Sequence, residues 1–369
     1  MKATATCDLC GAAFPETERI LVGEDCLCPD CAQERTILCS HCETRIYDDD
    51  NAGHTQMPLC QNCYDRYYTS CESCGRIIHN DDAFYTDEDD DIPLCRECYH
   101  HTASSKIIHD YYYKPEPIFY GNGSRYFGVE LELDIGGEIS GKAAKLIERA
   151  QVMGAETLYC KHDGSLDDGF ELVTHPMTLE YHQREMPWPS ILQGCVELGY
   201  RSHQARTCGL HVHVNRDSLG ESLEDQDATI ARILYFFEKH WDELLKFSRR
   251  TQRQLERWAA RYGYKEQPME ILDHAKRGYH GGRYTCVNLQ NRDTIEFRIF
   301  RGTLKYNTLI ATLQLVDRIC DTALHLSDEE MKSLSWTTFV ASCPQPELVQ
   351  YLKERRLYIN EPVESEVEL

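Results

Sequence analysis

The sequence predicts an α+β protein in which a domain built on an antiparallel sheet follows three small metal-binding modules. Twelve of the 19 cysteines form six Cys-x-x-Cys pairs before residue 99. After residue 125, segments of alternating polar and apolar residues recur between turns and helical stretches. These strands and helices do not alternate regularly, which favours hairpins and an antiparallel sheet over a parallel α/β fold.

The cysteine pairs repeat along the first hundred residues. The first pair of each repeat recurs every 32 residues, at Cys7/Cys10, Cys39/Cys42 and Cys71/Cys74. Each of these pairs is followed by a second pair, at Cys28/Cys31, Cys60/Cys63 and Cys95/Cys98. Four thiolates at this spacing are typical of structural zinc, and a module of about thirty residues folds only with its metal. We therefore predict three zinc modules of zinc-ribbon or LIM type, over residues 1–36, 37–68 and 69–101.

Other metal ligands and other metals were weighed for these modules. Further donors lie nearby, and we treat them as bystanders because each module already has four sulfurs: Cys26, His41, His54, His79, His100 and His101. An iron–sulfur cluster is the alternative, but ferredoxin-type cysteines are spaced more tightly.

The charge of the chain is strongly negative in both halves. The net formal charge is −22, of which residues 1–114 carry −13 (9 Lys and Arg against 22 Asp and Glu). Such a chain does not attract a phosphate backbone, so nucleic-acid binding is disfavoured. The zinc repeat is then expected to bind a protein or substrate, or to be a purely structural lid. Without a signal peptide or long apolar run, and with metal-type cysteines, a cytoplasmic protein is expected, with no membrane contact.

An aromatic connector over residues 102–125 leads into the segment around which the second domain is organised. Its prolines and glycines exclude a helix, and its tyrosines are expected to pack onto the large domain, residues 126–358. In the strand that follows, Glu130, Glu132 and Asp134 share one face and repel one another. That face is either solvated or holds a divalent cation.

The remaining elements follow in order along the chain. Helices are expected over 140–153, 178–199 (interrupted by two prolines), 225–247, 251–262, 305–325 and 346–356. Strands are expected over 157–161, 170–173 and 209–215, with a hairpin of 283–290 and 294–300. The acidic tail over 359–369 is expected to fray.

Polar side chains on these strands suggest one shared site. The candidates are Glu130, Glu132, Glu171, His211, His213, Glu296, Arg298 and Arg301. Carboxylates with an imidazole suit Mg²⁺ or Mn²⁺, and arginines beside such a metal suit a phosphate. The combination favours phosphoryl transfer. No glycine-rich phosphate-binding loop occurs in the sequence, so a nucleotide would be held by metals and the sheet surface.

Five motifs in order resemble the amidoligases, which belong to the glutamine synthetase and glutamate–cysteine ligase superfamily of carboxylate–amine ligases. They are Phe-Gly-Val-Glu-Leu-Glu from residue 127, His-Asp-Gly-Ser-Leu from 162, Phe-Glu-Leu-Val-Thr-His-Pro from 170, Cys-Gly-Leu-His-Val-His-Val-Asn from 208, and Val-Asn-Leu-Gln from 287 followed by Thr-Ile-Glu-Phe-Arg-Ile-Phe-Arg-Gly-Thr-Leu from 294. The resemblance covers about residues 111–325. It departs from the family at Thr174-His175-Pro176, where relatives often have Ser-Pro-Pro.

The resemblance implies a glutamine synthetase-like domain that uses ATP and Mg²⁺ (or Mn²⁺) to join a carboxylate to an amine through an acyl phosphate. It implies Glu130, Glu132, Glu171 and Glu296 as metal ligands, His211 as a ligand between metal and nucleotide phosphate, and Arg298 and Arg301 as phosphate-binding residues. His213 lies beside them as a metal-binding or catalytic residue. Asp163 and Ser165 are placed for the substrate or amine, and Asn288 for the nucleotide or for the hairpin alone.

Other functions are consistent with the same residues. The chain could be an adaptor whose zinc repeat binds a protein and whose second domain is a degenerate ligase scaffold. A metal-dependent hydrolase is a weaker alternative. Cys208 beside the two histidines could form a Cys–His nucleophile, but nothing in the sequence supplies an oxyanion site. The residues identify neither the carboxylate substrate nor the amine. The carboxylate could belong to an amino acid, a peptide or a protein.

Overall fold

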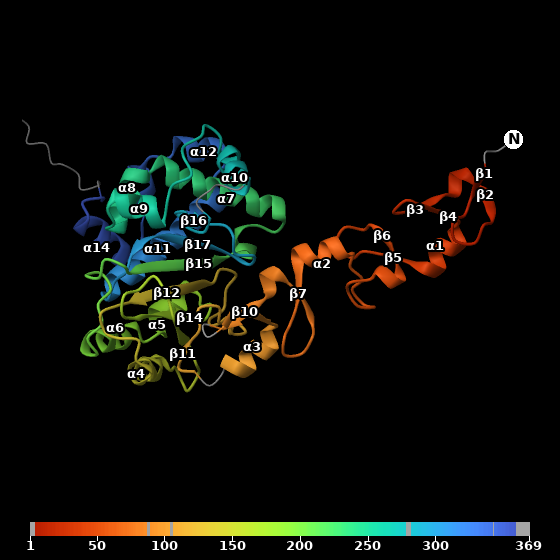
Figure 1. Cartoon of the computed structure of the whole chain (residues 1–369). Coiled ribbons are helices and arrows are strands. Elements are labelled where there is room, and N and C mark those ends of the chain that lie inside the picture. The colour runs from red at the N-terminus through yellow and green to blue at the C-terminus, as the bar shows by residue number, and fades with distance from the viewer. Residues whose placement is uncertain (1–3, 87–88, 104–105, 278–281, 342, 359–369) are drawn as a thin grey trace, which may run out of the picture. The chain divides into compact units, whose positions relative to one another are not determined.

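The computed structural model describes residues 4–86, 89–103, 106–277, 282–341 and 343–358. The chain forms two compact units, Met1–Ser105 and Lys106–Leu369 (Figure 1). The acidic tail predicted over 359–369 lies outside the described residues. Within the described part of the chain, no helix combines the length and apolarity needed to cross a membrane.

The first unit repeats one small motif of short antiparallel strands followed by a helix. The strands are β1 (Thr4–Thr6), β2 (Ala13–Pro15), β3 (Ile20–Val22), β4 (Asp25–Leu27), β5 (Thr36–Leu38), β6 (Arg45–Tyr47), β7 (Tyr68–Ser70), β8 (Ile77–His79), β9 (Phe84–Thr86) and β10 (Asp89–Leu94). The helices are α1 (Pro29–Arg35), α2 (Gln61–Tyr67) and α3 (Arg96–Ala103). Each helix begins directly after a cysteine of the second pair of its module, so the metal ligands and the helix start coincide.

The second unit contains a seven-stranded sheet with the order β11-β13-β14-β12-β15-β17-β16. The strands are β11 (Ile108–His109), β12 (Phe127–Leu133), β13 (Leu158–Lys161), β14 (Phe170–Thr174), β15 (Gly209–Asn215), β16 (Val287–Asn288) and β17 (Thr294–Arg301). Its pairings are antiparallel except that β11 runs parallel to β13. This confirms the predicted predominantly antiparallel sheet.

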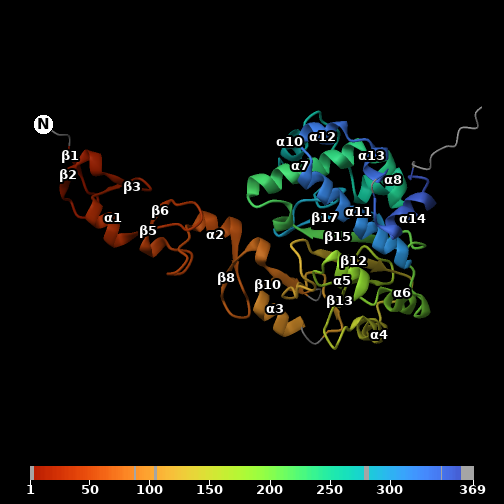
Figure 2. The same cartoon turned by 180° about the vertical axis from the view of Figure 1, so that it is seen from behind.

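Helices bury the apolar face of this sheet (Figure 2). They are α4 (Ser140–Ala150), α5 (Leu179–Arg184), α6 (Trp188–Glu197), α7 (Leu223–Lys239), α8 (Trp241–Ser248), α9 (Gln252–Trp258), α10 (Pro268–Lys276), α11 (Tyr306–His325), α12 (Asp328–Ser333), α13 (Trp336–Ala341) and α14 (Pro346–Glu354). Leu131 of β12, Val212 of β15 and Phe297 of β17 are fully buried in the same core as side chains of α7 and α11. Since side chains alternate along a strand, the other face is left for polar residues.

The helices differ from the prediction in several places. The helix expected over 225–247 is divided at His240, whose φ of −107° and ψ of 32° separate α7 from α8. Helix α10 was not predicted, although Pro268 at its first position and the Gln267–Glu270 capping box are ordinary start signals. Helices α12 and α13 were also missed, and the first hairpin strand contracts to the two residues of β16.

The aromatic connector packs on the second unit as predicted. The ring of Tyr113 lies edge-on to that of Tyr159 in β13, with centroids 5.5 Å apart. The hydroxyl of Tyr120 donates to the carbonyl of Glu156 at 2.7 Å. The backbone N–H of Ile118 donates to Nδ1 of His175 at 3.3 Å. His175, where the sequence departs from the expected motif, therefore contacts the connector.

Candidate metal and substrate sites

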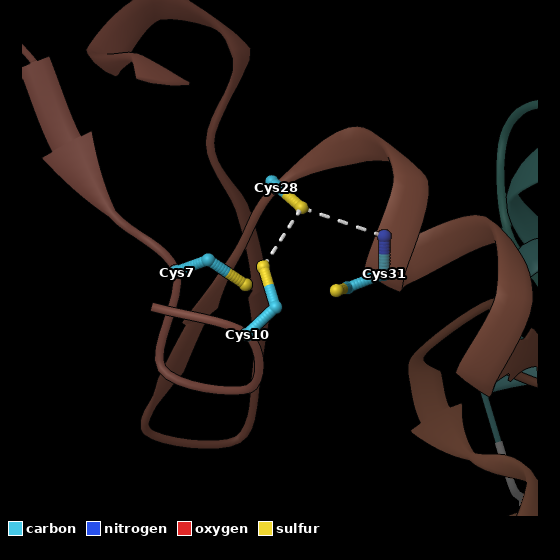
Figure 3. A group of neighbouring side chains, drawn as sticks. All are labelled: Cys7, Cys10, Cys28 and Cys31. Carbon is cyan, nitrogen blue, oxygen red and sulfur yellow. Dashed lines mark hydrogen bonds between the residues drawn. The ribbon is translucent and has the colours of Figure 1, made fainter. Parts of the chain in front are cut away.

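The cysteines of the first unit converge in three groups of four, and these are the groups that the sequence predicts: Cys7, Cys10, Cys28 and Cys31; Cys39, Cys42, Cys60 and Cys63; Cys71, Cys74, Cys95 and Cys98. Figure 3 shows the first group, with all four side chains pointing toward a common centre. Sulfur–sulfur distances of 3.9, 3.8 and 3.7 Å occur across the three groups. Tetrahedral zinc with Zn–S bonds of about 2.3 Å requires sulfurs about 3.8 Å apart, so the geometry fits zinc.

The electrostatics of these groups also favour metal-binding thiolates. Backbone N–H groups, first that of Cys28, lower the pKa of the Cys7 thiol to about 6. Two of the spare donors have other contacts: His41 and His79 both stack on Tyr67, with centroids 4.4 and 6.3 Å apart. Among the side chains that the structure describes, none of the bystanders joins a four-cysteine group. The side chains of His100 and His101 lie outside the described residues.

The polar face of the large sheet lines a cavity of about 670 Å³. Strand register places the candidate residues on this face, because Glu130 pairs with His211, Glu132 with Glu171, and His213 with Glu296. The cavity is lined by these predicted residues: Glu130, Glu132, Asp163, Ser165, Glu171, His211, His213, Asn288, Glu296 and Arg298. The described lining residues include seven Lys or Arg and six Asp or Glu side chains. A cavity of this composition can accept cations and phosphates together.

Three of these side chains form a potential metal-binding cluster. One ligand atom each of Glu130, His213 and Glu296 lies within 4.8 Å of the other two. Nε2 of His213 is 3.1 Å from Oε1 of Glu130 but is buried without a hydrogen-bond partner in the described part of the chain. Nδ1 of the same ring is 3.2 Å from Oγ1 of Thr294, which fixes the ring orientation. An imidazole held this way and two carboxylates are donors that suit Mg²⁺ or Mn²⁺.

The charges in this cluster are tightly coupled. Burial raises the pKa of Glu130, but the imidazoles of His213 and His211 outweigh burial and hold that pKa well below its usual range. Burial likewise opposes ionisation of Glu296, while His213 and Arg298 lower its pKa overall. The guanidinium of Arg298 pairs with Glu296. Both carboxylates are therefore ionised.

Three other predicted metal ligands, Glu132, Glu171 and His211, lie in the same cavity but outside this cluster, where His213 takes the place expected for His211. Glu132 accepts from the N–H of Gly209, and its Oε1 is 3.6 Å from Nε2 of His211. Glu171 instead pairs with Nζ of Lys161 at 3.1 Å. Burial raises the pKa of Glu171 to about 8, although Lys161 opposes the shift. The ion pair with Lys161 was not expected from the sequence.

The structure places Arg301 away from the lining of this cavity. Strand β17 shifts register against β15, and beyond the shift Arg301 pairs with Gly209. Nη1 of Arg301 lies 3.5 Å from the carbonyl of Arg249. Arg298 alone of the two predicted phosphate-binding arginines lines the cavity.

The smaller polar residues have local contacts as well as cavity positions. Asn288 donates from Nδ2 to Glu296 at 2.8 Å, so it supports that carboxylate. Oδ1 of Asp163 accepts from the N–H of Ser165 at 2.7 Å, which shapes their loop. Burial raises the pKa of Cys208, the reverse of what an activated thiol requires.

Asp134 does not line the cavity, although its position on the strand suggested that it would. It accepts from the N–H groups of Ile135 at 2.8 Å and Asp168 at 2.7 Å, and from Oγ1 of Thr207 at 2.5 Å. The third carboxylate of the acidic strand therefore anchors two loops at the edge of the site. Burial opposes its ionisation, but these hydrogen bonds, first that of Thr207, lower the pKa of Asp134 overall.

Several lining residues were not singled out from the sequence. They are Lys161, Arg206, Arg250, Arg257, Trp258, Arg283 and Tyr284. The sequence does indicate some of them, because residues 249–261, which include Arg250 and Arg257, are rich in arginine within an acidic chain. Lys161 gave no signal, because a single lysine on a strand is ordinary until its partner is known.

Comparisons with known proteins support the ligase resemblance over part of the chain. A family model described as "Putative amidoligase enzyme" matches residues 150–320. This range contains Glu171, His211, His213 and Glu296 but begins after β12, so Glu130 lies outside it. A search of curated protein sequences finds no match.

Among solved structures, the chain is similar to a bifunctional glutathione synthetase from Pasteurella multocida, with 14% identity and a TM-score of 0.35. The similarity covers 63% of this chain and 46% of that protein, so it spans less than half of the length of the synthetase.

Proposed function

We propose that the second unit is an ADP-forming carboxylate–amine ligase that uses ATP and Mg²⁺ or Mn²⁺. The observation that carries this proposal is the cluster of Glu130, His213 and Glu296 beside Arg298, inside a cavity large enough for substrates. The amidoligase match over residues 150–320 supports amide-bond formation as the reaction.

The residues would divide the work as follows. Glu130, Glu296 and His213 would hold the divalent metal, with His211, Glu132 and Glu171 available in the same cavity. The bound metal would neutralise the negative charge of the phosphates. Arg298 would hold the transferred phosphate, for which its buried guanidinium is suited. Arg301 would act from a greater distance, since it does not line the cavity.

The reaction would proceed in two displacements. A carboxylate oxygen of the first substrate attacks the γ-phosphorus of ATP, the bond to the β-phosphate oxygen breaks, and ADP leaves. The amine nitrogen then attacks the acyl carbon of the acyl phosphate, inorganic phosphate leaves, and the nitrogen loses a proton to form the amide. Asp163 and Ser165 would contact the amine or the carboxylate substrate, and Asn288 would support Glu296 beside the nucleotide.

The zinc modules would select or present the substrate or a protein partner. Their acidic character disfavours nucleic acid. The carboxylate substrate would be an amino acid, a peptide or a protein.

The test is ADP release by the full chain with ATP, Mg²⁺ and pooled carboxylates and amines, with products identified by mass spectrometry. We expect Arg298→Ala to reduce the rate by about 10²–10³-fold, because it removes a preorganised charge. The zinc content of this variant should be unchanged. Its second unit should still unfold cooperatively when followed by tryptophan fluorescence, which separates lost chemistry from misfolding. Turnover of esters or amides without ATP would instead indicate a hydrolase. Thermal unfolding with and without ATP and Mg²⁺ tests the adaptor alternative. If the nucleotide does not stabilise the wild type, and Glu130→Gln and Glu296→Gln behave identically to it, the chain is an adaptor.

A further inference from the structure

A second cavity of the large unit gathers positive charge. It has a volume of about 390 Å³ and is formed around the end of α8, the residue after α14, and the loop that precedes β15. Its cationic residues are Lys246, Arg249, Arg250 and Arg355, with His203 beside them. Asp242 is the single carboxylate among the described lining residues. We call this cavity the arginine pocket.

Three cations of the arginine pocket lack carboxylate partners. Within the described ranges of the chain, none of Lys246, Arg249 and Arg355 forms an ion pair, whereas Arg250 interacts with Glu132 of the larger cavity. Collecting three unpaired positive charges beside one carboxylate is unfavourable unless an anion compensates them. Their concentration is more notable because the chain as a whole carries a net charge of −22.

His203 presents a hydrogen-bond donor in the same place. Nη2 of Arg249 is 3.1 Å from Nε2 of His203, and a guanidinium can only donate, so Nε2 is the acceptor. Burial and then the charge of Arg249 lower the pKa of His203 to about 4, which keeps the ring neutral. The proton of the neutral ring is therefore on Nδ1. That atom is buried without a hydrogen-bond partner among the described residues.

Helix capping explains only part of the cluster. The guanidinium of Arg355 donates to the carbonyl of Lys246 at 2.8 and 3.0 Å, and Nζ of Lys246 donates to the carbonyl of Arg356 at 3.1 Å. Cations near the end of α8 are favourable for this reason. Capping does not use the guanidinium of Arg249 or the buried Nδ1 of His203. Arg249 itself ends α8 in the left-handed backbone conformation, with φ of 62°.

We propose that the arginine pocket binds an oxyanion with two or more negative charges, either a phosphate group or a polycarboxylate. The guanidinium of Arg249 and the Nδ1–H of His203 would donate to its oxygens, and Arg250 and Lys246 would neutralise its charge. Arg250 also lines the larger cavity, so a bound anion lies next to the metal and substrate site. This proposal does not rest on ligase activity.

The experiment is isothermal titration calorimetry of the zinc-loaded full chain with inorganic phosphate and, separately, with citrate, at constant ionic strength and pH 7.5. We expect saturable binding of at least one of the two anions. Phosphate binding alone would assign a phosphorylated ligand, and citrate binding alone would assign a polycarboxylate. Binding of neither anion overturns the proposal.

Variants locate the binding. Arg249→Gln should weaken it at least tenfold, and Arg184→Gln, at an exposed arginine of α5 that lines neither cavity, should change it less than twofold. Arg298→Gln tests whether the anion binds in the larger cavity instead. Arg249→Gly is the second variant, because glycine adopts the left-handed backbone readily and keeps the loop folded. Equal binding by wild type and both Arg249 variants overturns the proposal, as does binding that only Arg298→Gln removes. Since catalysis is not measured, failure of the ligase proposal leaves this result interpretable.

Discussion

A buried histidine behind the acidic strand should make the second unit sensitive to acid. His182 is fully buried, and its Nε2 donates to the carbonyl of Phe127 at 3.1 Å. Its Nδ1 accepts from Nε1 of Trp188 at 3.3 Å. Acceptance at Nδ1 requires the neutral ring, and burial, opposed by the bond to Phe127, lowers the pKa of His182 from 6.5 to about 4. Phe127 begins β12, so this histidine holds the strand that carries Glu130.

The direction and size of the effect follow from linkage. A pKa that is lower in the folded state than in the unfolded state gives stability that is present above the unfolded pKa and lost as the pH falls. Between pH 7.5 and pH 5 the unfolded His182 gains a proton and the folded one does not. With a folded pKa of about 4, this costs about 2 kcal/mol at pH 5.

The perturbation is His182→Gln, since glutamine can donate to Phe127 and accept from Trp188 but does not titrate. Urea unfolding followed by tryptophan fluorescence reports on the second unit, because all four tryptophans lie beyond residue 105. Wild type should lose about 2 kcal/mol more stability than the variant between pH 7.5 and pH 5, a difference of about 1 M in the urea midpoint. His203, His240 and the zinc ligands titrate equally in both proteins, so they cancel. Equal losses in the two proteins would refute the reasoning.

Two further predictions concern packing and zinc. Gly169→Ala should destabilise the second unit by about 3 kcal/mol in the same assay, because a Cβ there would lie 1.9 Å from the carbonyl of Leu133. The matched change Gly141→Ala in α4 meets nothing within 4 Å and should be neutral or stabilise by up to about 1 kcal/mol; similar losses at both sites would contradict the steric explanation. Cys42→Ser should lower the zinc content from three to two per chain by mass spectrometry, with unchanged tryptophan-monitored unfolding, and full retention of zinc would contradict the grouping of ligands.

Sequence patterns predicted what depends on short-range geometry. Spacing alone was enough to group the twelve cysteines correctly, because the two pairs of one module lie close together in the sequence. Alternation along β12, β15 and β17 was enough to place Glu130, His213 and Glu296 on polar faces. Antiparallel pairing then aligned those faces.

Long-range contacts were not readable from the sequence. Nothing near Glu171 indicated that Lys161, ten residues earlier, would lie beside it through the β13–β14 pairing. Because β15 and β17 shift register, Arg298 lines the cavity and Arg301 does not. Such a shift has no reliable signature in the local sequence. Asp134 continues the alternation of β12 but bonds to loops, since it lies beyond the last residue of the strand.

Binding of a non-hydrolysable ATP analogue, measured by calorimetry with and without Mg²⁺, is the most direct test of the claim that the acidic strands hold a metal ion for a nucleotide. Binding should require Mg²⁺ and should weaken about 10–100-fold in Glu130→Gln and in Glu296→Gln. The matched control Glu180→Gln, an exposed glutamate of α5, should bind as wild type. Binding that is independent of the metal, or equal in all four proteins, would contradict the account.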